Sequence, residues 1–476
     1  IFAATLAWEN ERDLAFEYIS KGLAYNEKNY ELYFMLGNYY ADINHNQAWL
    51  CYENAEYLCE KSRENAEDLK LITGVRTTYM YNNRVTVKPA SIIILSYNTL
   101  EYTKLCIESI NVSCKPGTYE IIVVDNASSD GSTEWLEKQP NIKLLKNKMN
   151  EGFPKGCNQG IAISKPGNDI FLLNNDTVMC FNSLFNMRMA LYSSENNGSV
   201  GSVTNCAVNN QEVDVLFNDL KDYMEYAMEI NIPNKNPTEI KTWLVGFAVL
   251  FKRNVLDEIG TLDELYSPGH FEDNDIGYRI CEAGYDNLLC HNAFIFHWGS
   301  RSFDKGGESK RKEISDINKL KFQKKWGFNP DYYSNVRTEL IDMIDDTSET
   351  KISVLELGCG AGATLAHIKY LYPNSYVCGI EYVKKISDFA NQDLHIMCGD
   401  VENRAFPYIK EQFDYAVAHK DRNFGNARYA RNVFEKSIQA QANRLEGKSN
   451  LSERELTELT VSDLQEGFAS KSNIGK

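Results

Sequence analysis

The chain has 476 residues, of which 24% are charged and 43% hydrophobic, and its formal net charge is −16 at pH 7. This composition is typical of globular domains and excludes a collagen-like or wholly disordered chain. The length predicts about three domains. An acidic chain lacks the basic face that nucleic-acid phosphates require, so we expect no nucleic-acid partner.

Twelve cysteines are spread along the chain without a Cys-x-x-Cys pair. This spacing is typical of core thiols in a reducing compartment rather than of a zinc ribbon or a redox motif. No run approaches the ~18 apolar residues of a transmembrane helix, and no signal peptide is recognisable. We therefore predict a cytoplasmic protein without a transmembrane segment, at most peripheral to the membrane face. The sequence starts at Ile1 within an expected helix, so we expect a truncated N-terminus.

Residues 1–60 are rich in helix formers and contain no proline. The spacing Tyr33-x-x-Leu36-Gly37 resembles part of a tetratricopeptide repeat, a helix pair in which small residues let the backbones approach. The resemblance implies that a protein partner docks on these helices; an unrelated helical hairpin is the alternative. The polar stretch 61–89 is predicted to be a linker.

From Ala90 on, short β-branched runs alternate with segments of helical periodicity. Such apolar strands are typical of a parallel sheet that is covered by helices on both faces. In these sheets, ligands bind at the carboxyl ends of the strands. Polar residues are therefore candidates for chemistry where they follow the predicted strands Ser91–Leu95, Glu120–Val124 and Ile170–Leu173.

Polar segments do follow these strands and recur further along the chain: Ser96-Tyr97-Asn98, Asp125–Ser132, Asn150–Phe153, Gly156–Gly160, Asn174-Asn175-Asp176, Gly246–Ala248, Phe271–Asp275 and His297–Ser300. In this order, they resemble glycosyltransferase family 2, in its rhamnosyltransferase-like branch. The resemblance implies an α/β fold of the GT-A type at residues 90–330, a Rossmann-like, mostly parallel sheet between helices. It also implies an inverting, metal-dependent enzyme that moves a sugar from a UDP or dTDP donor to a polysaccharide or protein acceptor, in cell-surface polysaccharide biosynthesis.

The resemblance places the nucleotide-sugar donor against the strand ends. Asp125 can accept a hydrogen bond from the imide N–H of uracil or thymine, which would select a pyrimidine; a turn cap is the alternative. Glycines would let the backbone turn tightly beside the nucleotide. The implied donor-binding residues are Ser96, Asn98, Asp125, Asn126, Gly152, Asn158, Asn175 and Asp176.

A metal site is implied at two further positions of the resemblance. Asp176 stands where the family's D-x-D motif has its last carboxylate, and His297 stands where many members have a late histidine. These two residues would hold Mg²⁺ or Mn²⁺ against the donor diphosphate, whose charge grows as it leaves. Asn174 and Asn175 replace acids of other branches, which lowers the expected metal affinity. A turn-capping Asp176 and a structural His297 are the alternatives.

The acidic cluster Glu272-Asp273-Asn274-Asp275 opens a predicted helix that ends at Gly284. The simple interpretation is that acids stabilise the positive end of the helix dipole. The cluster also matches the family's E-D motif, whose aspartate is the general base. The resemblance therefore implies Asp273 as the catalytic base, with Glu272 and Asp275 on the acceptor side.

Residues 354–362 have the pattern of a strand, a glycine-rich turn and a helix start, and resemble motif I of class I S-adenosylmethionine-dependent methyltransferases. The matching region, 335–418, is shorter than a complete methyltransferase and has no recognisable acceptor site, so we expect cofactor binding at most. An NAD-type Rossmann unit is the alternative, because the glycine pattern is weak alone. The implied S-adenosylmethionine-binding residues are Glu356, Gly358, Gly360, Gly362, Glu381 and Asp400.

The last segment, 419–476, contains Gly425–Asn432 and resembles the helical lid of AAA+ ATPases. The chain lacks a Walker A loop, so we expect a structural or interaction segment rather than an ATPase. Two alternatives to the transferase remain open at this point. One is a non-catalytic, repeat-bearing adaptor with degraded nucleotide-binding folds, and the other is a working methyltransferase.

Overall fold

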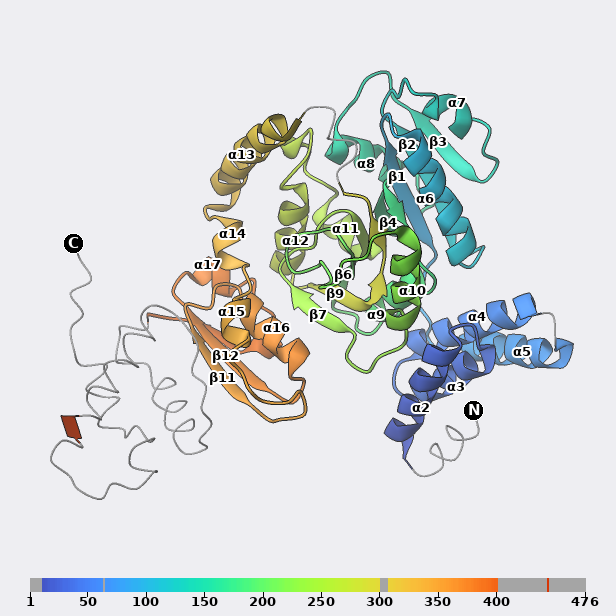
Figure 1. Cartoon of the computed structure of the whole chain (residues 1–476), viewed down its shortest axis with the longest axis horizontal. Coiled ribbons are helices and arrows are strands. Elements are labelled where there is room, and N and C mark those ends of the chain that lie inside the picture. Colours follow the sequence, from blue (N-terminus) through green and yellow to red (C-terminus); the bar gives the residue numbers. More distant parts are fainter. Residues whose placement is uncertain (1–10, 63–64, 300–306, 401–442, 445–476) are drawn as a thin grey trace. The chain divides into compact units, whose positions relative to one another are not determined.

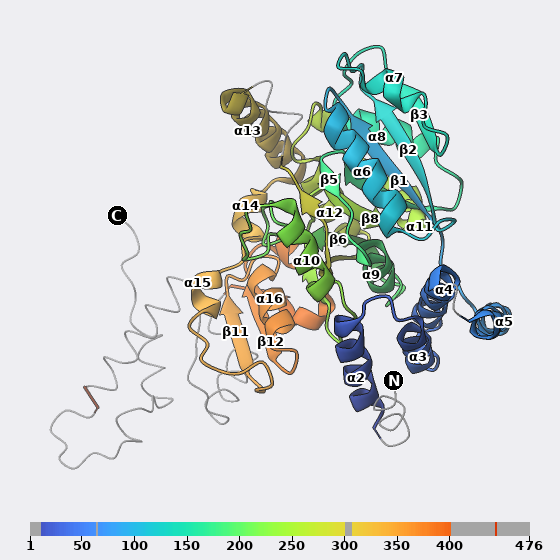
Figure 2. The ribbon, with the colours of Figure 1, turned by 45° about the vertical axis from the view of Figure 1, so that its right-hand side comes forward.

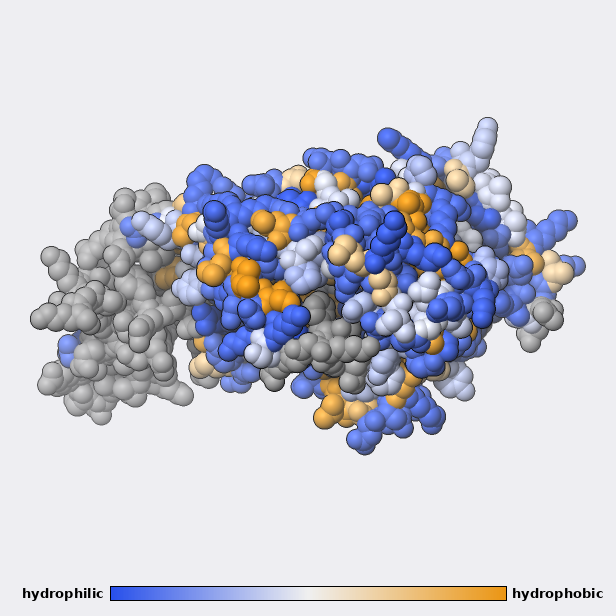
Figure 3. Space-filling view, turned by 90° about the horizontal axis from the view of Figure 1, so that it is seen from above, coloured by the Kyte–Doolittle hydropathy of each residue, from blue (hydrophilic) through white to orange (hydrophobic). Residues whose placement is uncertain are grey.

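The computed structural model of the chain describes residues 11–62, 65–299, 307–400 and 443–444. The chain divides into two compact units, residues 1–330 and 331–476. Among the helices in the described ranges, none combines the length and hydropathy needed to cross a bilayer. Figure 3 shows one face of the molecule, where hydrophilic side chains prevail and hydrophobic ones form small groups, in agreement with a mean hydropathy of −0.42.

The described chain begins with helices that pack in sequence order (Figure 1). Gly37 is needed because a Cβ atom there would lie 2.4 Å from Cε1 of the Tyr52 ring. The Tyr52 side chain thus occupies the space beside Gly37, and the resemblance to a tetratricopeptide repeat stays a prediction. The bounds of these helices are α2 (Arg12–Tyr25), α3 (Tyr30–Tyr40), α4 (His45–Ser62) and α5 (Ala66–Asn82).

Helix α5 corrects the predicted linker at 61–89, because most of that stretch is helical. The side chain of Asn65 caps α5 by accepting hydrogen bonds from the N–H groups of Glu67 and Asp68. Only Ile72 of this helix is buried, so its apolar stripe is too narrow to stand out in the sequence. Tertiary contacts hold it instead, including an ion pair of 2.9 Å between Arg76 Nε and Glu56 Oε2 on α4.

The N-terminal helices share a hydrophobic core with the sheet that follows them. Helix α4 contacts helix α9 (Ser183–Leu191), where Arg188 Nη1 lies 2.7 Å from Glu53 Oε2. The side-chain amide of Asn182 also donates a hydrogen bond of 2.7 Å to the Tyr33 hydroxyl. These helices are therefore built into the first unit, and docking of a partner on them stays a prediction.

The centre of the first unit is an eight-stranded sheet with the order β3-β2-β1-β4-β8-β6-β9-β7. Strands β3, β2, β1 and β4 run parallel, and β8 is antiparallel to β4. The bounds are β1 (Ala90–Ser96), β2 (Tyr119–Asp125), β3 (Ile142–Lys146), β4 (Asp169–Asn174), β6 (Asn197–Val203), β7 (Thr238–Lys241), β8 (Ala248–Phe251) and β9 (Asp286–Phe294).

Helices cover both faces of this sheet (Figure 2), which explains why the central strands β1, β2 and β4 are largely apolar. Ile92 and Ile94 of β1 belong to the same core cluster as Ile110 of helix α6 (Leu100–Ser113). Ile93 points to the opposite face and joins the cluster that contains Ile161 of helix α8 (Phe153–Ala162). The expected α/β fold, a mostly parallel sheet between helices, is confirmed.

The remaining elements of the first unit surround the edge of the sheet. A small antiparallel sheet pairs β5 with β10. Helix α13 follows His297 after a gap in the described residues. The bounds are β5 (Thr177–Val178), β10 (Phe296–His297), α7 (Ser132–Leu136), α10 (Leu220–Ile230), α11 (Arg253–Ile259), the 3-10 helix η1 (Glu264–Tyr266), α12 (Glu272–Glu282) and α13 (Gly307–Trp326).

The second unit has a three-stranded parallel sheet with the order β11-β12-β13. The predicted strand, glycine turn and helix of residues 354–362 are present, since β11 leads through Gly358 to α16. The lid-like tail at 419–476 lies outside the described residues, apart from 443–444. The bounds are α14 (Pro330–Tyr333), α15 (Thr338–Ile341), β11 (Ser353–Leu357), α16 (Ala363–Leu371), β12 (Tyr376–Glu381), α17 (Lys384–Ser387), η3 (Gln392–Leu394) and β13 (Ile396–Cys398).

Candidate active site

The predicted site residues gather at one edge of the large sheet. Asp125 ends β2, and Asp176 follows the end of β4. Strand β8 is antiparallel to β4, so the Gly246-Phe247 segment before β8 comes to the same edge. There, the backbone N–H of Asn174 donates a hydrogen bond of 2.7 Å to the Phe247 carbonyl. Segments more than 70 residues apart thus meet where the parallel strands end, as expected for such sheets.

Asp125 has one carboxylate oxygen engaged and one available. The side chain is 1% exposed. Its Oδ2 accepts hydrogen bonds from Thr133 Oγ1 at 2.6 Å and from the Ser128 N–H at 3.4 Å. Its Oδ1 is buried and has no hydrogen-bond partner in the described part of the chain. The turn contacts occupy only Oδ2, so they leave the ligand role possible for Oδ1, and contact of Oδ1 with a donor N–H group stays a prediction.

The other predicted donor-binding residues mainly hold the surrounding loops together. Asn126 accepts from Asn147 Nδ2 at 2.7 Å, and Asn158 donates to the Leu262 carbonyl at 2.8 Å. Direct contact of these residues with a donor stays a prediction. The same loop contacts engage Ser96 with Thr103, Asn98 with Ser129, Asn175 with Thr99 and Thr103, and Gly152 with Pro268.

Asp176 and His297 face each other, as a shared metal site would require. His297 Nδ1 lies 3.0 Å from the Cys206 carbonyl; a carbonyl can only accept, so Nδ1 carries a proton. His297 Nε2 lies 3.3 Å from Asp176 Oδ1 but forms no aligned hydrogen bond with a described residue. In the neutral ring, Nε2 presents its lone pair to the carboxylate. These two buried acceptors therefore favour a cation between them.

This donor set fits a divalent ion that also binds phosphate. A carboxylate oxygen and an imidazole nitrogen are ligands that Mn²⁺ accepts, and Mg²⁺ commonly takes one or two carboxylates plus substrate phosphates and water. In the described ranges, no group of three or more His, Cys, Asp or Glu side chains is arranged for a metal. Asp176 and His297 would thus supply two ligands, and a diphosphate with water the others.

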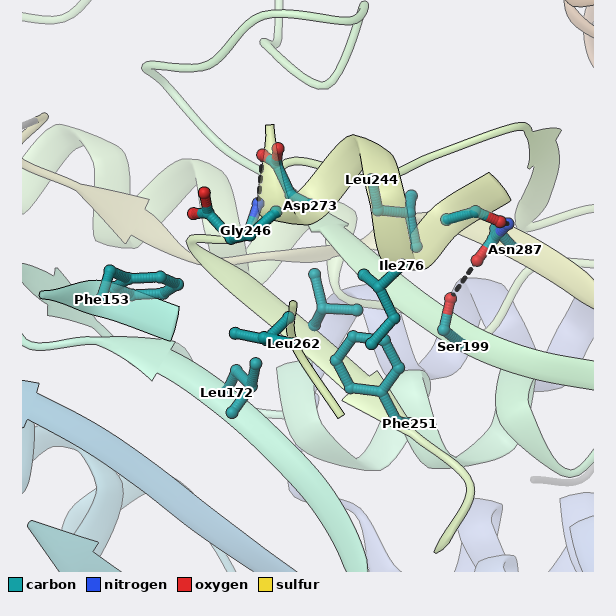
Figure 4. Close-up of a pocket in the computed structure, with 13 residues that line it drawn as sticks. Phe153, Leu172, Ser199, Leu244, Gly246, Phe251, Leu262, Asp273, Ile276 and Asn287 are labelled. Atoms are coloured by element: carbon teal, nitrogen blue, oxygen red, sulfur yellow. Dashed lines mark hydrogen bonds between the residues drawn. The ribbon is translucent and has the colours of Figure 1, made fainter. Parts of the chain in front are cut away.

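The Gly246-Phe247 segment connects this pair to Asp273. The Phe247 ring stacks on the His297 ring with centroids 5.0 Å apart and planes 18° from parallel. The Gly246 N–H donates a hydrogen bond of 3.3 Å to Asp273 Oδ2 (Figure 4). Asp273 Oδ1 accepts from the Asn274 N–H at 2.8 Å. Asp273 is therefore held at the same edge as the Asp176–His297 pair.

Burial changes the titration of the acidic pair at the start of α12. Loss of contact with water raises the pKa of Asp273, while N–H groups of Asn274 and Gly246 limit the rise. Burial and the nearby Asp273 carboxylate raise the pKa of Glu272 well above its usual range. Glu272 is 6% exposed, and its Oε2 has no hydrogen-bond partner among the described residues. An apolar pocket surrounds the pair, lined by Phe153, Leu172, Leu244, Phe251, Leu262 and Ile276 (Figure 4).

We expect Glu272→Gln to raise the melting temperature near neutral pH and to have little effect near about pH 4. The folded state keeps Glu272 protonated above the pKa of the unfolded chain, so wild-type stability falls as the pH rises between the two values. Glutamine does not titrate and avoids this loss. The exposed Glu282→Gln variant on the same helix is the control. Melting curves that show the same shift at both pH values would contradict this expectation.

The structure corrects the role predicted for Asp275. Its side chain is 0% exposed and accepts hydrogen bonds of 2.9 Å from both Trp326 Nε1 and Arg279 Nε. Lys325 Nζ lies 2.6 Å from the same carboxylate. Asp275 therefore anchors α12 to α13 and does not face an acceptor. The sequence-based interpretation missed α13, although Asn318, Phe322 and Trp326 recur at the four-residue spacing of a buried helix face.

In the second unit, the glycine-rich turn is satisfied internally. The five N–H groups from Gly358 to Gly362 bond to protein acceptors, which include the Glu381 carboxylate and the Tyr333 carbonyl. A pyrophosphate needs free N–H groups in such a turn, so this arrangement disfavours the NAD-type alternative.

Burial raises the pKa of Glu356 to about 8. Both Glu381 oxygens accept from backbone N–H groups, so the S-adenosylmethionine role of these residues stays a prediction.

Two family models match the chain. Residues 91–260 match "Glycosyl transferase family 2", and residues 399–474 match "AAA lid domain". The chain therefore carries a family 2 glycosyltransferase domain, in the region where the sequence resemblance placed it. The lid-like tail is also supported, but its match begins at 399 rather than 419. Asp400, which is exposed after β13, falls within the lid match, and its S-adenosylmethionine role stays a prediction.

Three solved structures match parts of the chain at low sequence identity. GalNAc-T7 with UDP, GalNAc and Mn²⁺ has 14% identity and a TM-score of 0.36, over 44% of this chain and 44% of that chain. The mannosyltransferase PcManGT from Pyrobaculum calidifontis, with GDP-Man and Mn²⁺, has 16% identity and a TM-score of 0.37, and the match covers 58% of this chain and 75% of that chain. S. aureus TarS 1–349 has 15% identity and a TM-score of 0.34, and the match covers 53% of this chain and 76% of that chain. This chain thus spans less than half of GalNAc-T7. No curated protein sequence matches significantly.

Proposed function

We propose that residues 90–330 transfer a sugar from a UDP or dTDP sugar to a hydroxyl group of a polysaccharide or protein acceptor, with inversion at the anomeric carbon. One observation carries the proposal: three carboxylates with different surroundings lie at one edge of the sheet. Asp125 has an oxygen without a hydrogen-bond partner among the described residues, Asp176 faces His297, and Asp273 has a raised pKa. These are the properties needed to bind the nucleobase of the donor, to hold its diphosphate and to accept a proton from the acceptor.

In this proposal, the donor lies along the strand ends. Asp125 Oδ1 accepts the imide N–H of the pyrimidine, because that oxygen is buried and has no partner in the part of the chain that the structure describes. Asp176 and His297 hold a divalent cation, which when bound would neutralise the charge that develops on the departing diphosphate. The Phe247 ring fixes the orientation of His297 by stacking on it, and the Cys206 carbonyl fixes which ring nitrogen faces Asp176.

Asp273 is the general base. The acceptor hydroxyl must lose its proton as it attacks the anomeric carbon from the face opposite the diphosphate. A carboxylate with a raised pKa is a better proton acceptor than an ordinary one, since its affinity for the proton is higher. The Gly246 N–H keeps the carboxylate oriented.

The twelve cysteines of the chain are unpaired, which supports the proposed cytoplasmic location.

The test is the choice of nucleotide, measured by calorimetry with Mn²⁺ present. We expect UDP to bind more tightly than CDP, whose base lacks the imide N–H, and Asp125→Ala to weaken UDP about 10–100-fold, the range for a hydrogen bond to a charged group. CDP binding should change less in this variant, so the discrimination is lost. The control is Asp130→Ala in the same loop, because Asp130 caps the turn through Ser132 and Leu100. Equal binding of ADP and UDP by the wild-type chain would refute the proposal.

A further inference from the structure

The loop in front of the proposed base has an unusual backbone. His270 and Phe271 have φ angles of 72° and 75°, in the left-handed region that non-glycine residues rarely occupy. Asp273 follows within two residues, in the first turn of α12. Two consecutive residues in this region persist only where surrounding contacts hold them. The contacts that hold this loop therefore determine where Asp273 lies.

Three of those contacts come from a single side chain on α13. Asn318 is 1% exposed, and its Nδ2 lies 2.6 Å from the Tyr266 carbonyl, 2.7 Å from the Gly269 carbonyl and 3.3 Å from the His270 carbonyl. One side-chain amide group thus contacts three backbone carbonyls of the loop. The Phe322 ring, one helical turn further along α13, packs against the Phe271 ring with centroids 5.9 Å apart.

The same helix also holds the element that carries Asp273. Trp326 Nε1 and Lys325 Nζ both contact the Asp275 carboxylate, two residues after Asp273. Helix α13 therefore contacts the chain on both sides of the proposed base. Asn318 bonds to the loop before it, and Trp326 bonds to helix α12, which follows it. All of these residues lie beyond residue 260, where the match to the glycosyltransferase family model ends.

We propose that Asn318 is a positioning residue, which holds the Tyr266–Phe271 loop in the conformation that places Asp273 beside Gly246. The proposal rests on the proposed function, since it assigns Asn318 a part in the proton transfer to Asp273. It makes α13 a required part of the catalytic unit. It also predicts that Asn318 acts on the rate of transfer more than on donor binding, because the donor-binding carboxylates Asp125 and Asp176 stand on other segments and the loop meets the predicted donor site only where Pro268 lies against Gly152.

The experiment compares Asn318→Leu with Asn197→Leu in the full chain. Leucine keeps the volume and removes the donor. Asn197 is a matched control, because it is 4% exposed and donates to the Ala190 carbonyl and to Ser193 Oγ, in the contacts between β6 and the end of α9. Amide hydrogen exchange is measured over residues 264–275, and kcat and the donor KM are measured for transfer. Asn318→Ser, too short to reach all three carbonyls, gives the same comparison if the leucine variant folds poorly.

We expect Asn318→Leu to speed exchange at Gly269 and Asp275, whose N–H groups bond to Tyr266 and Phe271, and to lower kcat about 10–100-fold with little change in donor KM. Asn197→Leu should do neither. Unchanged exchange in the Asn318 variants would overturn the proposal, as would faster exchange with normal kcat. If the wild-type chain transfers no sugar, the proposed function fails instead, and the exchange result alone decides whether Asn318 holds the loop.

Discussion

Asp273→Asn is expected to lower the rate of sugar transfer about 10²–10⁴-fold, the usual contribution of a general base, with donor affinity nearly unchanged and the melting temperature kept or raised, because the variant removes a carboxylate whose pKa burial raises. Asparagine has the size of aspartate and can still accept the hydrogen bond from the Gly246 N–H, so the loop geometry is retained. What it loses is the ability to take a proton from the acceptor hydroxyl. Single-turnover transfer with a bound donor measures this step directly.

The pH dependence of transfer shows whether Asp273 acts in its ionised form, as a base does. A base works in its ionised form, so activity should fall as the pH falls through the pKa of Asp273, which lies above the usual aspartate range. The control is Asp219→Asn, because Asp219 caps α10 by accepting from the Asp222 N–H and has no place in the site. Near-normal transfer by a stable Asp273→Asn variant would leave the helix-cap interpretation as the better one.

The main features of the site follow from the sequence because they depend on strand order. A polar residue at the end of a buried parallel strand must lie at one edge of the sheet, whatever the loops do. Asp125 and Asp176 were placed by this rule, and the structure brings them to that edge. Asp273 needed the family resemblance, because its position depends on the Gly246 segment before an antiparallel strand, which no local pattern indicates.

Other features could not be predicted because tertiary contacts decide them. An acidic cluster at a helix start does not show which carboxylate faces inward. At about 100° per residue, Asp275 points some 200° away from Asp273, and only the packing of α13 reveals that Asp275 is paired with Trp326 and Lys325. Asn318 lies 48 residues from the His270 carbonyl that it contacts. The sequence of helix α5 predicts a linker, because the contacts that stabilise this helix lie on α4 rather than in its own sequence.

Asp176→Ala is expected to abolish the Mn²⁺-dependent part of UDP affinity. In an acidic chain, a diphosphate meets net repulsion, so its charge has to be neutralised locally. Asp176 supplies the only carboxylate of the proposed two-residue metal site. We therefore expect Asp176→Ala to lower the metal affinity by more than the ~10–100-fold that the loss of an outer-shell partner costs. His297→Ala should weaken the metal response less, because the carboxylate carries the charge. Calorimetry of UDP binding with and without Mn²⁺ measures the difference for each variant.

The design of this experiment separates a metal ligand from a structural ion pair. His291 serves as the control, because its Nε2 lies 2.9 Å from Glu239 Oε2 on strands β9 and β7, a histidine–carboxylate pair like His297–Asp176 but outside the site. His291→Gln should keep the full response of UDP binding to Mn²⁺. If Asp176→Ala and His297→Ala also keep it, while both variants lose thermal stability, the 3.3 Å contact between these residues is an ordinary ion pair. UDP binding that is equally tight without any divalent ion would point the same way, since the diphosphate charge would then be met by other groups.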